Sequence, residues 1–149
     1  MCRKPIGWIG IVLLACGGNG SSPVPEPQSP TVALDRFLGA IETKNYQGIA
    51  LLWGNRGGAA QANRKLSAGY IDSVSQILEI YLRHDSYRIL NGPKPTPGNP
   101  NLMTFNVELE LRTCKHVQPI DMIRTRHGGW LVRDPHIEAA AKTVVQCPK

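Results

Sequence analysis

The feature that most constrains this 149-residue chain is a strict alternation of apolar and polar side chains past its midpoint. Apolar residues stand at every second position from Met103 to Leu111, and polar residues fill the positions between them. Because successive side chains of a strand point to opposite faces, the pattern predicts a long strand with one dry face and one wetted face. Such a strand needs antiparallel neighbours and a second layer that covers its dry face.

Three segments before this strand carry helical periodicity instead. The first, residues 29–44, begins with a serine cap and a proline in the first turn. The second, residues 46–53, stops at Gly54, and the third repeats apolar residues at threes and fours across residues 66–84. These segments are predicted to supply the covering layer of helices.

After His84, apolar side chains recur at every second residue, which is the spacing of a strand. The predicted strands are residues 87–90, 103–112, 117–126 and 130–133, with an irregular loop at residues 92–100 and a tight turn at Gly128 and Gly129. Asp134 and Pro135 begin a predicted short C-terminal helix. We therefore expect the α+β class, with N-terminal helices packed on a curved antiparallel sheet of about four strands.

This layout resembles the cone-shaped fold shared by nuclear transport factor two, ketosteroid isomerase and the SnoaL-like proteins. The helices, the alternating strand and the final hairpin with Gly129 and Trp130 carry the resemblance, which covers most of residues 31–137 and rests on layout. In that fold the sheet curls around a pocket closed by the helices. The resemblance implies six pocket candidates: Trp53, Tyr70, Phe105, Val107, Leu109 and Trp130. Apolar residues at regular spacing fill a core by default, and this alternative stays open.

Residues 1–16 have the anatomy of an export signal. Two cations, Arg3 and Lys4, precede a compact apolar stretch that ends at Cys16. The stretch is too short for a spanning helix, which needs about 20 residues. Its end is similar to the lipobox of bacterial lipoproteins, and this similarity implies removal of residues 1–15 and attachment of fatty acids such as palmitate to Cys16. The alternative is a secretory signal that is cut elsewhere and leaves Cys16 unmodified.

The expected mature chain has two parts. Residues 16–30 are rich in glycine, serine and proline and predict a flexible tether, and residues 31–149 match a single α+β domain. Loss of Arg3 and Lys4 lowers the formal charge of +6 by two. A charge of that size does not indicate a nucleic-acid partner. We expect the domain outside the cytoplasm, held by lipid to the cell membrane or to the outer membrane.

Two cysteines remain once the signal is removed and Cys16 is lipidated. Cys114 and Cys147 would face an oxidising compartment, where two thiols usually form a disulfide. This disulfide would join the C-terminal tail to the sheet and stabilise the fold by roughly 3–4 kcal/mol. A metal site is the alternative, because Cys114 and His116 share one face of a strand. Zinc needs three or four ligands, and no recognisable spacing supplies a third.

One carboxylate is a candidate catalytic group. If Glu108 and Glu110 face Arg124 and Arg126 across the hairpin, the opposite charges pair, and alternation places Asp121 on the inner face. Carboxyl groups in apolar cavities can act as acids or bases.

The rest of the sequence favours a binding domain over an enzyme. A bulge or a sheet edge at Pro119 would shift the register and leave Asp121 in solvent. The sequence shows neither a recognisable nucleophile motif nor a glycine-rich phosphate loop after a strand. We expect a membrane-anchored, non-catalytic domain that binds a small apolar ligand or an envelope protein, without a cofactor. The alternative is a small lyase or isomerase that uses Asp121.

Overall fold

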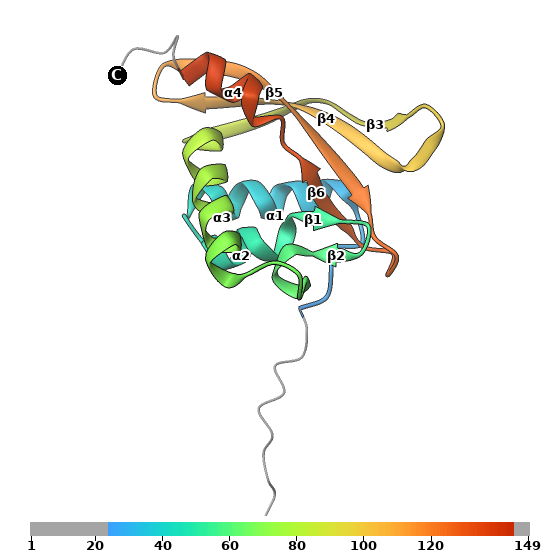
Figure 1. Ribbon diagram of the computed structural model, residues 1–149. Coiled ribbons are helices and arrows are strands. Elements are labelled where there is room, and N and C mark those ends of the chain that lie inside the picture. The colour runs from blue at the N-terminus through green and yellow to red at the C-terminus, as the bar shows by residue number, and fades with distance from the viewer. Residues whose placement is uncertain (1–23, 145–149) are drawn as a thin grey trace, which may run out of the picture.

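The computed structural model describes residues 24–144, and these residues form an α+β fold (Figure 1). Helices come first and an antiparallel sheet follows, so the predicted class is confirmed. The elements in chain order are α1 (Pro30–Glu42), α2 (Tyr46–Leu52), β1 (Gly54–Asn55), β2 (Gly58–Ala59), the 3-10 helix η1 (Ala60–Ala62), α3 (Ala68–Leu82), β3 (Ser86–Thr96), β4 (Asn99–Leu111), β5 (Cys114–Arg124), β6 (Trp130–Asp134) and α4 (Ile137–Val144).

The main sheet is an antiparallel meander in the order β3–β4–β5–β6, and β1 and β2 form a separate small hairpin. In Figure 1 the sheet is curved, α1, α2 and α3 gather on one side of it, and α4 lies at one end. β4 and β5 pair continuously from Leu102 opposite Ile123 to Leu111 opposite Cys114. β4 is the long strand that the alternation predicts, and β5 is its regular antiparallel neighbour.

The prediction of an irregular loop at residues 92–100 is wrong. β3 continues to Thr96 and β4 begins at Asn99, so the two strands form one long hairpin that turns at Gly98, where φ is +76°. The pairing of β3 with β4 shifts register at three places around Pro93 and Pro95. Proline has no amide hydrogen to donate to a ladder, so these residues make β3 irregular without ending it.

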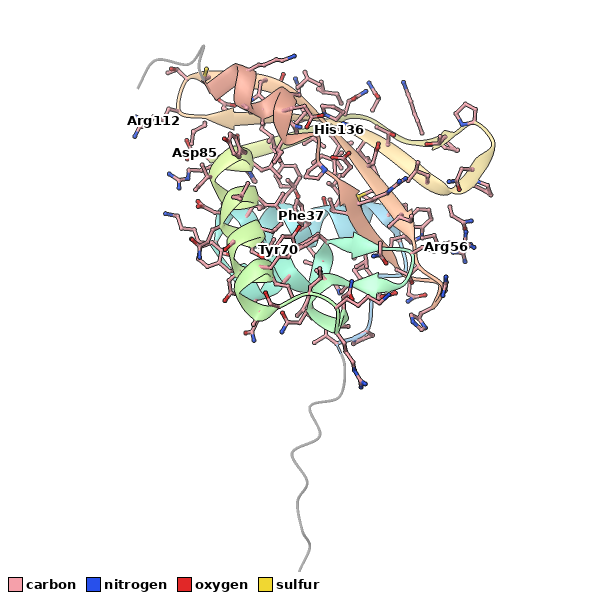
Figure 2. All side chains as sticks on the ribbon, in the orientation of Figure 1. Phe37, Arg56, Tyr70, Asp85, Arg112 and His136 are labelled. Atoms are coloured by element: carbon pink, nitrogen blue, oxygen red, sulfur yellow. The ribbon has the colours of Figure 1, made fainter. Side chains whose placement is uncertain are left out.

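The hydrophobic core lies between α1 and the inner face of the sheet, which is the face that carries Phe105 on β4. α1 presents Leu34, Phe37, Leu38 and Ile41 to this face, at the spacing of one helical stripe, and all four are buried. Figure 2 shows Phe37 in the space between the helices and the sheet. Burying a side chain of this size contributes about 1.5–3 kcal/mol, so α1 stabilises the fold chiefly through this stripe.

A second apolar cluster lies on the outer face of the β5–β6 hairpin. Its members are Ala59, Leu102, Ile123 and Leu131. The neighbouring Met122 and Val132 belong to the main core, and successive strand residues point to opposite faces. Trp53 pairs with Val132 at the edge of β6, so the chain that forms β1 and β2 covers this edge and the second cluster.

The N-terminal end of the described chain is fixed to the same hairpin. Pro27 is buried, and its carbonyl oxygen accepts a hydrogen bond of 2.8 Å from the backbone N–H of Trp130. The Glu26 carboxylate accepts a hydrogen bond from the hydroxyl of Thr125. The predicted tether of residues 16–30 is therefore too long, because its last residues pair with the sheet and belong to the domain.

Three segments meet at this place, which we call the junction. They are residues 26–27, the β1–β2 turn at residues 56–58 and the β5–β6 turn at residues 125–129. The two turns are joined by a hydrogen bond of 2.9 Å from the N–H of Arg126 to the carbonyl oxygen of Arg56.

The junction leaves no room for a side chain at Gly129. A Cβ there would overlap the Glu26 side chain and lie 3.3 Å from the Pro27 carbonyl oxygen. We expect Gly129→Ala to lower the free energy of unfolding in urea by about 1–3 kcal/mol, the usual cost of overpacking.

Gly39→Ala is the matched control, because a Cβ at Gly39 meets nothing within 4 Å. In the interior of α1, alanine is expected to raise stability by about 0.5–1 kcal/mol. A Gly129→Ala protein that is as stable as the wild type would contradict the fixed position of residues 26–27.

Candidate functional site

An open groove of about 470 Å³ lies on the surface between α2, η1 and α3. Its volume falls within the range of small-molecule sites, roughly 300–1,000 Å³. The lining residues come from the start of α2, from η1 and the loop after it, and from the first turns of α3. They are Tyr46, Gln47, Gln61, Ala62, Asn63, Arg64, Leu66, Ala68, Ile71 and Asp72.

Side-chain caps fix both helical walls of the groove. The Asn45 side-chain oxygen accepts a hydrogen bond of 2.9 Å from the N–H of Gly48, at the start of α2. The Ser67 hydroxyl accepts one of 3.2 Å from the N–H of Tyr70, at the start of α3. Each cap satisfies an amide that a helix N-terminus leaves without an internal partner. The groove therefore lies between two well-defined helix starts.

The groove is suited to a polar ligand. Gln47, Gln61 and Asn63 each bring an amide group, which both donates and accepts hydrogen bonds. Arg64 and Asp72 bring one charge of each sign, and Tyr46, Leu66 and Ile71 add apolar surface, of which the Tyr46 side chain is exposed. Hydroxyl, amide or carboxylate groups on a ligand would find partners here. The sequence did not reveal this site, because its lining residues share no motif and the groove arises from the way α2, η1 and α3 pack.

The structure places the six pocket candidates in different environments. Phe105, Val107, Leu109 and Trp130 belong to the main core and are at most 6% exposed. They pack with Phe37 and the other buried side chains of α1, which is the filled-core alternative.

Trp53 and Tyr70 lie at the margin of this core or outside it. Trp53 is partly buried and packs against the main core from the end of α2. Tyr70 is 53% exposed on α3 and is not part of the main core. The buried stripe of α3 is instead formed by Ile71, Leu78 and Leu82, which lie on another face of the helix.

Asp121 lies on the outer face of the sheet. Its neighbours Ile120 and Met122 are completely buried in the main core, so alternation directs Asp121 to the opposite side. Its partner across β4 is Thr104, whose hydroxyl donates a hydrogen bond of 2.6 Å to Asp121 Oδ1. Asp121 therefore does not enter an apolar cavity.

The cross-strand pairs that would have placed Asp121 inside are wrong. Glu108 lies opposite Val117, and Glu110 lies opposite Lys115, with 3.2 Å between the Lys115 ammonium and the Glu110 carboxylate. The short turn between β4 and β5 sets this register, which brings neither glutamate opposite an arginine of β5; Glu108 instead pairs with Arg88 of β3 at 3.1 Å.

The suggested bulge at Pro119 is also wrong, because the pairing of β4 with β5 passes through Pro119 opposite Asn106 without a shift. β6 pairs with β5 only from Asp121 to Arg124. At Pro119 the second side of β5 has no strand, so the missing amide hydrogen need not remove a ladder bond.

Asp121 belongs to a polar cluster that includes His136 and Glu138. His136 Nε2 lies 3.0 Å from Asp121 Oδ2, and its Nδ1 lies 3.4 Å from a carboxylate oxygen of Glu138. Burial alone would lower the pKa of His136, but the hydrogen bonds to these carboxylates and the charges of Asp134 and Asp121 raise it above the ordinary value. The surrounding carboxylates thus stabilise the imidazolium form of His136.

This arrangement leaves His136 unsuited to general acid–base catalysis. Both ring nitrogens already face carboxylate oxygens of the chain itself, and a catalytic base needs a nitrogen within hydrogen-bond reach of the substrate. The backbone of the same residue is fixed as well, because the buried Gln118 Nε2 donates a hydrogen bond of 2.8 Å to the His136 carbonyl oxygen. The cluster therefore attaches the start of α4 to the edge of β5.

The predicted disulfide falls partly outside the described residues, since these do not include Cys147. Cys16, the predicted lipidation site, lies outside them too. Cys114 opens β5 and alternates onto the same face as His116. Burial lowers the pKa of His116, so its ring favours the neutral form. Between residues 24 and 144, no three side chains of the His, Cys, Asp and Glu types come together as a metal site.

No protein-family model matches this chain, and no curated protein is significantly similar to it in sequence. The helices of residues 24–144 include none that is long and apolar enough to cross a membrane. The interpretation of the site therefore depends on its geometry and chemistry.

The raised pKa of His136 predicts a pH-dependent contribution to stability. The charged cluster stabilises the fold fully below the ordinary histidine value of 6.5, and this contribution is lost as the pH rises through the raised pKa. We expect His136→Asn to lower the free energy of unfolding by about 0.5–1 kcal/mol near pH 5.5 and by less near pH 9. Asparagine suits this test because His136 has a φ of +46°, which asparagine tolerates.

The control is His127→Asn, which changes an exposed histidine in the β5–β6 turn. This substitution leaves the Asp121–His136 pair in place, so the pH-dependent contribution of that pair to the free energy of unfolding should remain in the same urea titrations. A difference between wild type and His136→Asn that stays constant from acid to alkaline pH would contradict the charged cluster.

Proposed function

We propose that this chain is a lipid-anchored lipoprotein of the bacterial envelope whose α+β domain binds a small polar ligand, or a short segment of an envelope protein, and catalyses no reaction. The helices-on-sheet layout supports a relationship to the SnoaL-like, cone-shaped domains as part of this proposal. The anchor part is supported by the signal-like residues 1–15 and by Cys16 directly after them.

The observation that carries the binding role is the contrast between the groove and the rest of the polar side chains. In the Asp121 cluster, the acids and the histidine satisfy one another, and the core beneath the sheet is packed with apolar groups. The groove instead directs amide and charged groups toward an open volume of about 470 Å³. We therefore propose a ligand with polar groups in place of the small apolar ligand that the sequence predicted.

The lyase or isomerase alternative loses its main support. It needed Asp121 in an apolar pocket, and this carboxylate lies on the outer face with Thr104 and His136 as hydrogen-bond partners. A carboxylate that is paired in this way on the outer face does not lie in the apolar pocket that the lyase or isomerase alternative requires.

Metabolic labelling tests the anchor. Cells that express the full chain and receive labelled palmitate are expected to incorporate the label into the protein, because a lipoprotein cysteine becomes acylated. Cys16→Ser should abolish this labelling, and Cys2→Ser should leave it unchanged, because Cys2 lies in the part that is removed. Equal labelling of the Cys16→Ser chain would contradict the proposed site.

Filling the groove tests the binding role. Ala68 lines the groove and is exposed, so Ala68→Trp should occupy the volume without disturbing the core. Ile77→Trp is the matched control, because Ile77 is 41% exposed on α3 and does not line the groove.

Native mass spectrometry of each protein released from its own membrane provides the measurement. We expect a co-purifying molecule with the wild type and with Ile77→Trp, and its loss from Ala68→Trp. Equal retention by both variants, or no bound molecule on the wild type, would contradict binding in the groove.

A further inference from the structure

The junction gathers positive charge. Arg56 lies in the β1–β2 turn, Arg124 ends β5 and Arg126 lies in the β5–β6 turn, and all three are exposed. The hydrogen bond from Arg126 to Arg56 holds the two turns together at 2.9 Å. Figure 2 shows Arg56 at the rim of the molecule, near the tip of this hairpin. We refer to these residues as the junction arginines.

The junction arginines have little negative charge around them. Within the described chain, none of the three forms an ion pair. Glu26 is the one acidic residue of the junction segments, and its carboxylate accepts a hydrogen bond from Thr125. The junction therefore carries a net positive charge.

The opposite end of the sheet is different. There the Lys115 ammonium pairs with Glu110 at 3.2 Å, and an Asp85 carboxylate oxygen accepts a hydrogen bond of 2.6 Å from the backbone N–H of Arg112, which brings a second carboxylate to this end. Figure 2 shows Asp85 and Arg112 together, far from Arg56. β5 separates the two ends by its 11 residues, or about 35 Å of strand. Two carboxylates, Glu110 and Asp85, thus accompany the two cations named at this end, whereas Glu26 alone accompanies the three junction arginines and leaves that end unbalanced.

The unbalanced end is also the end to which the tether leads. Glu26 is part of the junction and follows Cys16 by ten residues. Ten residues span at most about 35 Å when fully extended. The junction is therefore the part of the domain that the anchor holds nearest to the membrane, and the β4–β5 turn can lie farther away by the length of β5.

We infer that the junction arginines bind the anionic phospholipid headgroups of the membrane that holds the anchor, and that this contact orients the domain with its junction toward the bilayer. The inference rests on the lipid anchor proposed above. Guanidinium groups bind phosphate through paired hydrogen bonds as well as charge. A tether of this length keeps the local concentration of headgroups high, so a contact that is weak alone is sufficient to orient the domain.

The test uses the chain from position 16 onward with Cys16→Ser, so that neither the signal nor lipid contributes to binding. This chain retains every element of the described fold, which lies within residues 24–144. Its partition onto vesicles of phosphatidylglycerol and phosphatidylcholine is measured by sedimentation at low salt. Vesicles of phosphatidylcholine alone give the neutral reference.

The variant Arg56→Gln, Arg124→Gln, Arg126→Gln is expected to lose binding to the anionic vesicles by about a hundredfold, or about fivefold for each charge. The control variant Arg112→Gln, Lys115→Gln, Lys142→Gln removes three exposed cations from the β4–β5 turn and from α4. It changes the net charge equally and should lose less than about threefold. Replacing the junction arginines with lysine should retain most of the binding.

Equal losses in the two triple variants would overturn the inference, because net charge alone would then explain binding. Equal binding to neutral vesicles would overturn it as well. The vesicle measurement does not depend on acylation, so its failure is distinguishable from failure of the palmitate labelling, which concerns only the anchor.

Discussion

Burial of the inner face of the sheet beneath α1 is the constraint on which the rest of the structure depends. The stripe that contains Phe37 meets the face that contains Phe105, and both side chains are almost completely buried. This contact fixes which face of every strand is dry. It therefore sends Asp121 to the outer face and leaves polar side chains such as those of the groove on the surface. The candidate site lies outside this packing, because the pocket candidates on the strands, such as Phe105 and Trp130, are buried in the main core.

The second organising feature is the covering of the free edge of β6 by other parts of the chain. Trp53 bridges to Val132, and residues 26–27 pair with the β5–β6 turn, so a late hairpin is closed by two early segments of the chain. Unpaired strand edges invite pairing with other chains, and here the protein covers one edge with its own backbone. The same closure places the start of the domain beside the junction arginines. A single piece of local packing thus determines where the tether leaves the fold.

The spacing of apolar residues in the sequence predicted the features that depend on residues close together in the chain. The helical stripe of α1 and the alternation of β4 both depend on neighbours one turn or two residues away, and both were predicted correctly. Features that depend on contacts between separate elements were missed: the groove between α2 and α3, and the pairing of His136 with Asp121. The alternative that kept Asp121 out of the pocket agrees with the structure, whereas its inward orientation is wrong. That orientation was inferred from charge pairing, whereas the short turn after β4 sets the register.

The prolines of β3 have a further consequence when copies of this domain are held close together. β3 is the one edge of the main sheet that no other segment is seen to cover within residues 24–144, and its pairing with β4 is broken by register shifts around Pro93 and Pro95. A strand interrupted in this way presents no continuous row of donors and acceptors to a neighbour. Crowded copies of the domain can therefore meet at this edge without their β3 strands pairing into a shared sheet. Each copy then remains a separate folding unit.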